Sequence, residues 1–435
     1  MNQELRHLRR ISSVRSGNNL KFLTPAVYSG GWCPMRTACN ICEDIAGMSY
    51  LIVGMPECAT YSRGMNAMPE GSNGEQRRIY VLDANEVIFG CREGLIGALR
   101  IMDSEGARAI LMIATCVTDL IGEDFEGVIH ELQPELNARL SYITLGQFKN
   151  FGSGVGVLKT VESFGAMMTS KPASRNRANA LFVEGWHNKN DAIMLPLIVD
   201  AMEERGVDVR RITSGAALDD YLAAPDAALN MPLSAGMQPL AAKMNALFDI
   251  PYAPLHNAIS VADVDAVYGM IAARFGIEWG SAFDVWRDKA ATLEERARVE
   301  LKGLRYVMLP GVDMAVNLAV YLASFGMEPL LLTVEDLHGE DIGYAKRLGA
   351  AGYDPPVCRM MNIDLDIEVV RRINPDISLG YIPDPIEGFI CVEEMGDFYG
   401  MTGYERTACL LERILNVLNT GKTEGRIDRH GILSF

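Results

Sequence analysis

Three of the nine cysteines in this 435-residue chain lie where a metal centre could form. Cys58 follows an apolar run that ends at Val53, and Cys116 follows one that ends at Ile113. Both runs have the pattern of buried parallel strands, and ligands of such sheets gather at the carboxyl ends of the strands. Cys33 follows a turn with two glycines, which permits close backbone approach. Three thiolates can therefore converge, and thiolates select iron–sulfur clusters or zinc.

Helical stretches are expected just after two of these cysteines. They begin near Tyr61 and Leu120, so Cys58 and Cys116 are predicted to precede helices. A thiol near a helix N-terminus has a lowered pKa, which favours its thiolate form and the binding of a metal.

Ordinary core packing is the alternative for each thiol, because a free cysteine is among the most commonly buried residues. A rival metal set combines Cys33 with Cys39 and Cys42, whose C-x-x-C spacing suits zinc. No second pair completes that zinc site, and the stretch Ala38–Tyr50 predicts a helix with both residues in the core. Cys91 could approach the proposed centre, but packing is the preferred interpretation for it. Packing is also expected for the isolated residues Cys358, Cys391 and Cys409.

The elements that must position the thiols alternate short apolar runs with amphipathic stretches in three successive segments. This pattern is typical of βαβ units and predicts an α/β protein with three Rossmann-like domains, each a parallel sheet flanked by helices. The first expected domain, 1–170, holds the three candidate cysteines and an N-terminal arm. The second is 171–302, and the third, 303–435, ends in a C-terminal helix. The expected strands are Tyr50–Val53, Ala109–Ile113, Ala180–Val183, Val207–Ile212, Arg305–Leu309 and Pro329–Thr333, and the expected helices include Ala192–Glu204, Asp284–Leu304 (exposed) and Met314–Phe325.

Composition narrows the class of protein. A formal net charge of -16 repels nucleic acid and anionic lipid, so neither is an expected partner. The basic arm Arg6, Arg9, Arg10 and Arg15 is a local exception that predicts solvated charge or a subunit contact. The N-terminus lacks the apolar core of a signal peptide, and polar residues interrupt the most apolar stretch, so a cytoplasmic protein without a membrane span is expected. Neither G-x-G-x-x-G nor a Walker A pattern is present, which argues against a nucleotide site.

The cysteine segments resemble a known family, nitrogenase component 1. The resemblance lies in Ala114–Asp124 around Cys116, in Val87–Gly90, in Tyr50–Thr60 with Gly54 and Cys58, and in Cys33–Pro34. The separations of 25 and 58 residues between the three cysteines match the β-type subunit better than the α-type. Gly403–Glu405 is similar to the family's C-terminal region.

The resemblance implies an α2β2 assembly with an electron-relay cluster at each αβ interface. Cys33, Cys58 and Cys116 correspond to the β-side ligands of that iron–sulfur cluster, a P-cluster of the 8Fe–7S type or a 4Fe–4S cluster. Ser153, in a Gly-rich loop, is a further candidate ligand, although such a hydroxyl is commonly a turn residue. The family's α-type subunit binds the catalytic cofactor through a Cys and a His. The comparable segments here, Ala228–Ser234 and Cys391–Tyr399, lack that Cys and that His, so the cofactor is expected on the α-like partner.

The function implied by the resemblance is that of an oxidoreductase subunit. A separate ATP-dependent iron protein would deliver electrons, with Thr118–Ile121 as a candidate docking surface and core packing as the alternative for Leu120 and Ile121. The preferred member is the β-like subunit of methylthio-alkane reductase, which cleaves C–S bonds. The alternatives are a scaffold for cofactor assembly, a tetrapyrrole reductase subunit, and a non-catalytic metal-binding protein. His187, in a loop, is either a proton donor or a solvated side chain.

Overall fold

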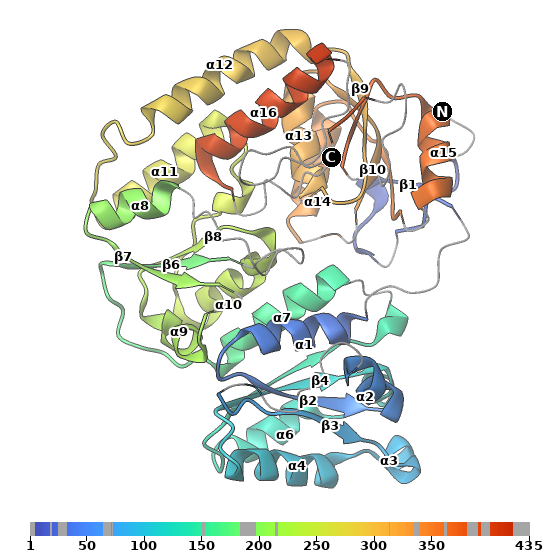
Figure 1. Ribbon diagram of the computed structural model, residues 1–435, viewed down its shortest axis with the longest axis vertical. Helices are drawn as coiled ribbons and strands as arrows, with labels where there is room; N and C mark the ends of the chain where they lie inside the picture. The colour runs from blue at the N-terminus through green and yellow to red at the C-terminus, as the bar shows by residue number, and fades with distance from the viewer. Residues whose placement is uncertain are drawn as a thin grey trace.

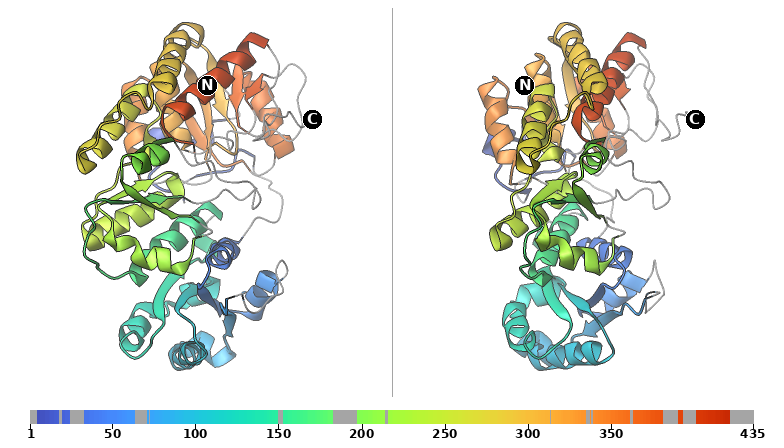
Figure 2. Two further views of the ribbon diagram at one scale, coloured as in Figure 1. Left: turned by 60° about the vertical axis from the view of Figure 1, so that its left-hand side comes forward. Right: turned by 90° about the vertical axis from the view of Figure 1, so that its left-hand side faces the viewer.

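The computed structural model shows three sheets arranged along the molecule, with the second sheet between the first and the third (Figures 1 and 2). It describes residues 5–17, 20–24, 33–63, 71, 73–149, 153–182, 197–213, 216–312, 314–334, 337, 339–360, 363–380, 390–392 and 401–420. Parallel sheets flanked by helices confirm the predicted α/β class.

The first sheet carries the cysteine segments. Its order is β3-β2-β4-β5, and all neighbouring strands are parallel. One face packs against α1 and α7, and the other packs against α4 and α6. Strand residues alternate between the two faces and are apolar on both, as in a doubly covered sheet. The elements are β2 (Ser49–Gly54), β3 (Arg77–Val81), β4 (Ala109–Ala114), β5 (Arg139–Thr144), α1 (Pro34–Asp44), α2 (Pro56–Arg63), α3 (Ala84–Phe89), α4 (Arg92–Ser104), α5 (Cys116–Ile121), α6 (Phe125–Leu132) and α7 (Ser153–Met167).

The second sheet, β7-β6-β8, is also parallel. Side chains of α9 and α10 share a core with α1 and α7, which joins the second sheet to the first. Those of α8 and α11 belong to the core that continues into the third sheet. The elements are β6 (Arg177–Leu181), β7 (Asp208–Ile212), β8 (Leu229–Pro232), α8 (Leu197–Glu204), α9 (Leu218–Ala223), α10 (Gln238–Phe248) and α11 (Val261–Phe275).

The third sheet has the order β1-β11-β10-β9-β12-β13 and is parallel except for β1 (Arg9–Arg10). The N-terminal arm, expected with the first domain, therefore pairs with the third sheet, where it covers the edge strand β11 and satisfies its backbone groups. Leu5 and Leu8 of the arm pack with side chains of the third sheet. The elements are β9 (Arg305–Met308), β10 (Glu328–Thr333), β11 (Pro356–Cys358), β12 (Ile377–Leu379), β13 (Cys391–Val392), α12 (Asp284–Glu300), α13 (Ala315–Ser324), α14 (Asp341–Ala350), α15 (Ile363–Ile373) and α16 (Gly403–Thr420).

Four of the expected helices differ from the observed ones in extent or exposure. The helix expected over Ala38–Tyr50 begins earlier and ends at Asp44, because Tyr50 belongs to β2. The helices expected after Cys58 and Cys116 begin at Pro56 and Cys116, so both cysteines are helical. The α12 helix, expected to be exposed, packs along α16 and buries one face. None of the described helices is long and apolar enough to span a bilayer.

Candidate functional site

Cys58 and Cys116 lie beyond the carboxyl ends of two adjacent parallel strands. Val53 of β2 is level with Ala114 of β4, so the segments that follow leave the sheet at the same edge. Thr115 and Thr118 both donate hydrogen bonds to the Val53 carbonyl, at 3.0 and 3.2 Å. These bonds hold the start of α5 against the end of β2.

Gly54 makes this close approach possible. A Cβ at Gly54 would overlap the Thr115 hydroxyl. The glycine is therefore needed where the loop toward Cys58 passes the loop toward Cys116, which explains why a glycine ends β2.

Cys33 is the third thiol of the group. It is the N-cap residue of α1 and directly precedes the first turn of that helix. Burial raises the pKa of the Cys33 thiol, as do the charges of the neighbouring Cys116 and Cys58, whereas the backbone N–H groups of Met35 and Arg36 lower it. Cys33 therefore lies within electrostatic reach of both other predicted ligands.

The loops around these thiols are tied to one another. The backbone N–H of Cys33 donates to the hydroxyl of Tyr61 in α2 at 3.4 Å. In α5, Asp119 accepts bonds from the Gly146 N–H at 3.2 Å and from Lys149 at 2.7 Å. Gly146 and Lys149 follow β5, so these bonds tie α5 to the segment after that strand.

Ser153 is the first residue of α7, and its side chain lies outside the described residues. The helix itself packs closely on the start of α1, because a Cβ at Gly156 would lie 2.8 Å from the Pro34 carbonyl oxygen. The backbone of Ser153 is therefore one turn from this contact. Its role as a ligand stays a prediction.

Exposure separates these three thiols from most other cysteines. Cys33, Cys58, Cys116 and Cys409 are half-buried, and the other five are buried. Cys39 and Cys42 lie in the core under α1, where burial raises both pKa values, so their predicted packing is confirmed. Cys409 lies apart from the group on α16.

Cys91 is also buried, and its surroundings differ from those of the other candidates. Its backbone N–H donates to Glu123 at 2.7 Å, and burial followed by the charge of Glu123 raises its pKa. The structure thus gives Cys91 a packing environment beside a carboxylate.

The donor set fits a polynuclear cluster. Among the described residues, no three Cys, His, Asp or Glu side chains lie close enough to hold one metal ion. Cys33, Cys58 and Cys116 belong to three different segments of the chain, as thiolates bound to different irons of one cluster do. All three are half-buried, as ligands at a surface shared with another chain would be.

An apolar surface lies next to Cys116. Leu120 of α5 is 72% exposed, and Ile88 and Phe89 of α3 are 72% and 83% exposed. The two helices are in contact. Core packing is thus wrong for Leu120, and large apolar side chains clustered on a surface mark a protein interface.

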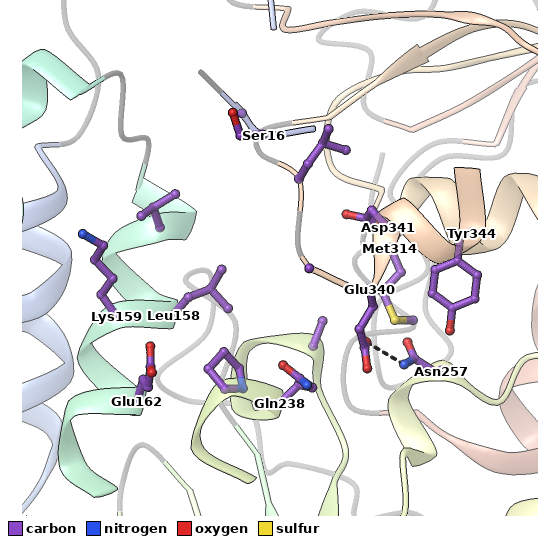
Figure 3. A pocket seen from close by; sticks show the side chains of 16 residues that line it. Ser16, Leu158, Lys159, Glu162, Gln238, Asn257, Met314, Glu340, Asp341 and Tyr344 are labelled. Carbon is purple, nitrogen blue, oxygen red and sulfur yellow. Dashed lines mark hydrogen bonds between the residues drawn. The ribbon is translucent and has the colours of Figure 1, made fainter. Parts of the chain in front are cut away.

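A separate cavity of about 350 Å³ lies where α7, the start of α10 and the start of α14 meet (Figure 3). Its charged lining residues are Lys159, Glu162, Glu340 and Asp341. The Asn257 amide donates to Glu340 at 2.7 Å and orients its carboxylate (Figure 3). None of the described lining residues is a cysteine or histidine, and their soft donor is the thioether of Met314.

Two sequence predictions lie outside the described residues. They are His187 and all but the first two residues of the segment Cys391–Tyr399. Cys391 and Val392 themselves form β13.

Comparison with known proteins gives consistent results. The family model described as nitrogenase component 1 type oxidoreductase matches residues 33–419. The chain is 24% identical over 316 residues to nitrogenase iron-molybdenum cofactor biosynthesis protein NifE of Clostridium pasteurianum, which covers 69% of this chain and 67% of that protein. It is 26% identical over 355 residues to the NifE of a Nostoc species, with 75% and 70% covered.

Solved structures show the same fold. The structure titled nitrogenase Cp1 at pH 6.5 superimposes with a TM-score of 0.64 at 14% identity, over 92% of this chain and 94% of that one. The structure titled nitrogenase Cp1 at pH 5 gives a TM-score of 0.56 at 17% identity, over 91% and 90%. At these identities the likeness concerns the fold alone.

Proposed function

The chain belongs to the nitrogenase component 1 type oxidoreductase family, and on that premise we propose that it is the β-like subunit of a nitrogenase-like reductase. In this proposal Cys33, Cys58 and Cys116 bind an iron–sulfur cluster that relays electrons to a cofactor on an α-like partner. One observation carries the proposal: the half-buried thiol of Cys33 lies within electrostatic reach of the half-buried thiols of Cys58 and Cys116, which follow neighbouring strands at one edge of the first sheet. Such a donor set is the one that iron–sulfur clusters require.

The residues around the thiols would position and shield this group. When bound, an iron–sulfur cluster stores and releases single electrons. The Thr115 and Thr118 bonds hold the segment of Cys116 in place, and Tyr61 anchors the backbone of Cys33. The half-exposed side of the group is where the partner subunit would complete the ligand set and exclude water. This sharing would make an αβ pair, and we propose that two such pairs form an α2β2 assembly.

Leu120, Ile88 and Phe89 supply an apolar surface beside Cys116. We assign this surface to protein docking, either of the α-like partner or of an ATP-dependent iron protein that delivers electrons. The absence of G-x-G-x-x-G and Walker A patterns supports a separate protein as the ATP-hydrolysing component.

The lining of the cavity where α7, α10 and α14 meet favours a cofactor site on the partner chain over one on this chain. It has no thiol or imidazole among its described lining residues and carries three carboxylates against one ammonium. An anionic metal cofactor would be repelled there. Reductive cleavage of a methylthio-alkane consumes two electrons and two protons and yields methanethiol and an alkane, and we propose this reaction for the complex.

Cofactor assembly is the second candidate function, because both curated relatives bear names of iron-molybdenum cofactor biosynthesis proteins. A scaffold would hold a cofactor precursor without turnover. A tetrapyrrole reductase subunit is a third candidate within the same family.

Turnover distinguishes these candidates. The chain is produced anaerobically with its partner, and the complex is incubated with an iron protein, ATP and a methylthio-alkane. The proposal expects methanethiol in proportion to the ATP hydrolysed. A complex that carries the relay cluster, releases no methanethiol, and transfers a cofactor to an apo-reductase would establish the assembly function instead. Reduction of a tetrapyrrole would establish the third.

A further inference from the structure

Behind Cys33, α1 and β2 enclose a pair of opposite charges. The side chains of Arg36 and Glu43 are only 2% and 6% exposed. Their guanidinium and carboxylate groups meet at two points, 3.4 Å from Nη1 to Oε1 and 3.5 Å from Nη2 to Oε2. The hydroxyl of Tyr50 in β2 donates to Glu43 Oε1 at 2.8 Å. The carboxylate is thus fixed between α1, which Cys33 caps, and the strand that leads toward Cys58.

Stability alone is a weak reason for this arrangement. Removing two charges from water costs free energy that their attraction often fails to recover, so an apolar pair of similar volume is commonly as stable or more stable. The position of the pair therefore points to an electrostatic role.

The pair is held close to Cys33, because the backbone N–H of Arg36 donates to the Cys33 carbonyl at 2.8 Å. The same helix carries the thiol of Cys39. This thiol is fully buried on α1, and burial raises its pKa, as do the charges of Glu43 and Cys33. Arg36 and a hydrogen bond with Tyr50 act in the opposite direction. One thiol thus responds both to the pair and to a predicted cluster ligand. In so dry a region, solvent ions screen these interactions weakly.

We propose that Arg36 and Glu43 are positioning residues that set the electrostatic potential, and thereby the reduction potential, at the cluster held by Cys33, Cys58 and Cys116; this inference rests on the proposed function. The guanidinium of Arg36 stays protonated in proteins, so its charge is permanent. Glu43 offsets that charge. A nearby positive charge favours the reduced form of a cluster, because reduction makes the cluster more negative.

A redox titration tests the inference through the sign of the change. The anaerobically purified complex is titrated with dithionite and mediators, and EPR follows the cluster as it takes up one electron. Glu43→Gln removes the negative charge against Arg36 and should shift the midpoint potential in the positive direction. The double variant Arg36→Gln/Glu43→Gln removes both charges and should return the potential toward the wild-type value.

A matched control lies in the second sheet, where Asp226 pairs with Arg210 at 2.8 Å. Asp226→Asn removes a partly buried carboxylate from an arginine in the same way and should leave the potential unchanged. A double variant shifted as far as the single variant, or further, would show a merely structural disturbance and overturn the inference.

An unshifted potential in Glu43→Gln, with the cluster present, would also overturn the inference and leave the cluster assignment intact. A wild-type complex without iron would overturn the proposed function itself. If Glu43→Gln does not fold, Arg36→Gln at alkaline pH should shift the potential in the negative direction, and a positive shift or none would refute the inference.

Discussion

The effect of a substitution at Gly156 can be worked out from the contact of α7 with α1. A Cβ added at this position would lie 2.8 Å from the carbonyl oxygen of Pro34 and 3.2 Å from its Cα. Such atoms rest roughly 3.5 Å apart, so the two helices must separate by about half an ångström. Backbone atoms cannot rotate aside, so Gly156→Ala should displace Pro34 and, with it, Cys33.

The free energy of unfolding should respond modestly. Alanine gains about 1 kcal/mol of helix propensity over glycine, and overpacking costs about 1–3 kcal/mol. The net loss is then about 0–2 kcal/mol. The iron content per chain should respond more strongly than the unfolding free energy does, because residues that bind a metal centre tolerate displacements of only about 0.5 Å.

Gly97 in α4 provides the matched control. A Cβ there meets nothing within 4 Å, so Gly97→Ala should stabilise the protein by about 0.5–1 kcal/mol and keep its iron. The assays are thermal unfolding by circular dichroism and iron per chain. Equal iron content and equal stability in the two variants would refute the reasoning about the α1–α7 contact.

Further predictions concern the core, the surface and acid stability. Cys39→Ala should cost about 1–2 kcal/mol of unfolding free energy in thermal unfolding. Leu120→Asp should weaken binding of a partner protein in pull-down and calorimetry, with stability within about 0.5 kcal/mol of wild type; unchanged binding would contradict the docking assignment. Burial raises the pKa of Asp226, but Arg210 and Arg177 lower it more, so it lies below 3.8. Its stabilisation is therefore present above that pH and lost as the pH falls through the folded-state pKa. The destabilisation by Asp226→Asn should shrink in acid, and a pH-independent difference would contradict this.

The sequence predicted the strands well where the apolar runs are long. The expected strands Tyr50–Val53 and Ala109–Ile113 lie within β2 and β4, and Pro329–Thr333 lies within β10. These runs are buried on both faces, so hydrophobicity alone identifies them. The short strands β12 and β13 were missed, because two or three apolar residues give no periodic signal.

Long-range pairing could not be predicted from local pattern. The N-terminal arm has ordinary basic residues, yet Arg9 and Arg10 pair with β11, more than 300 residues away. The Arg36–Glu43 pair was also missed, because charged residues seven positions apart on a helix are expected in solvent. In the structure both side chains are buried, and Tyr50 of β2 donates a hydrogen bond to Glu43. Cys58 and Cys116, in contrast, were predicted to lie together because strand ends of a parallel sheet share one edge, and the glycine turn before Cys33 added the third thiol.

The central claim is that Cys33, Cys58 and Cys116 bind an iron–sulfur cluster. It is tested most directly by iron and acid-labile sulfide analysis, with EPR, of the anaerobically purified complex carrying Cys116→Ala or Cys39→Ala. The account predicts that Cys116→Ala loses the cluster's iron, sulfide and EPR signal, whereas Cys39→Ala keeps them. Full iron content and an unchanged signal in Cys116→Ala would contradict it, and loss in Cys39→Ala alone would establish the rival set of Cys33, Cys39 and Cys42.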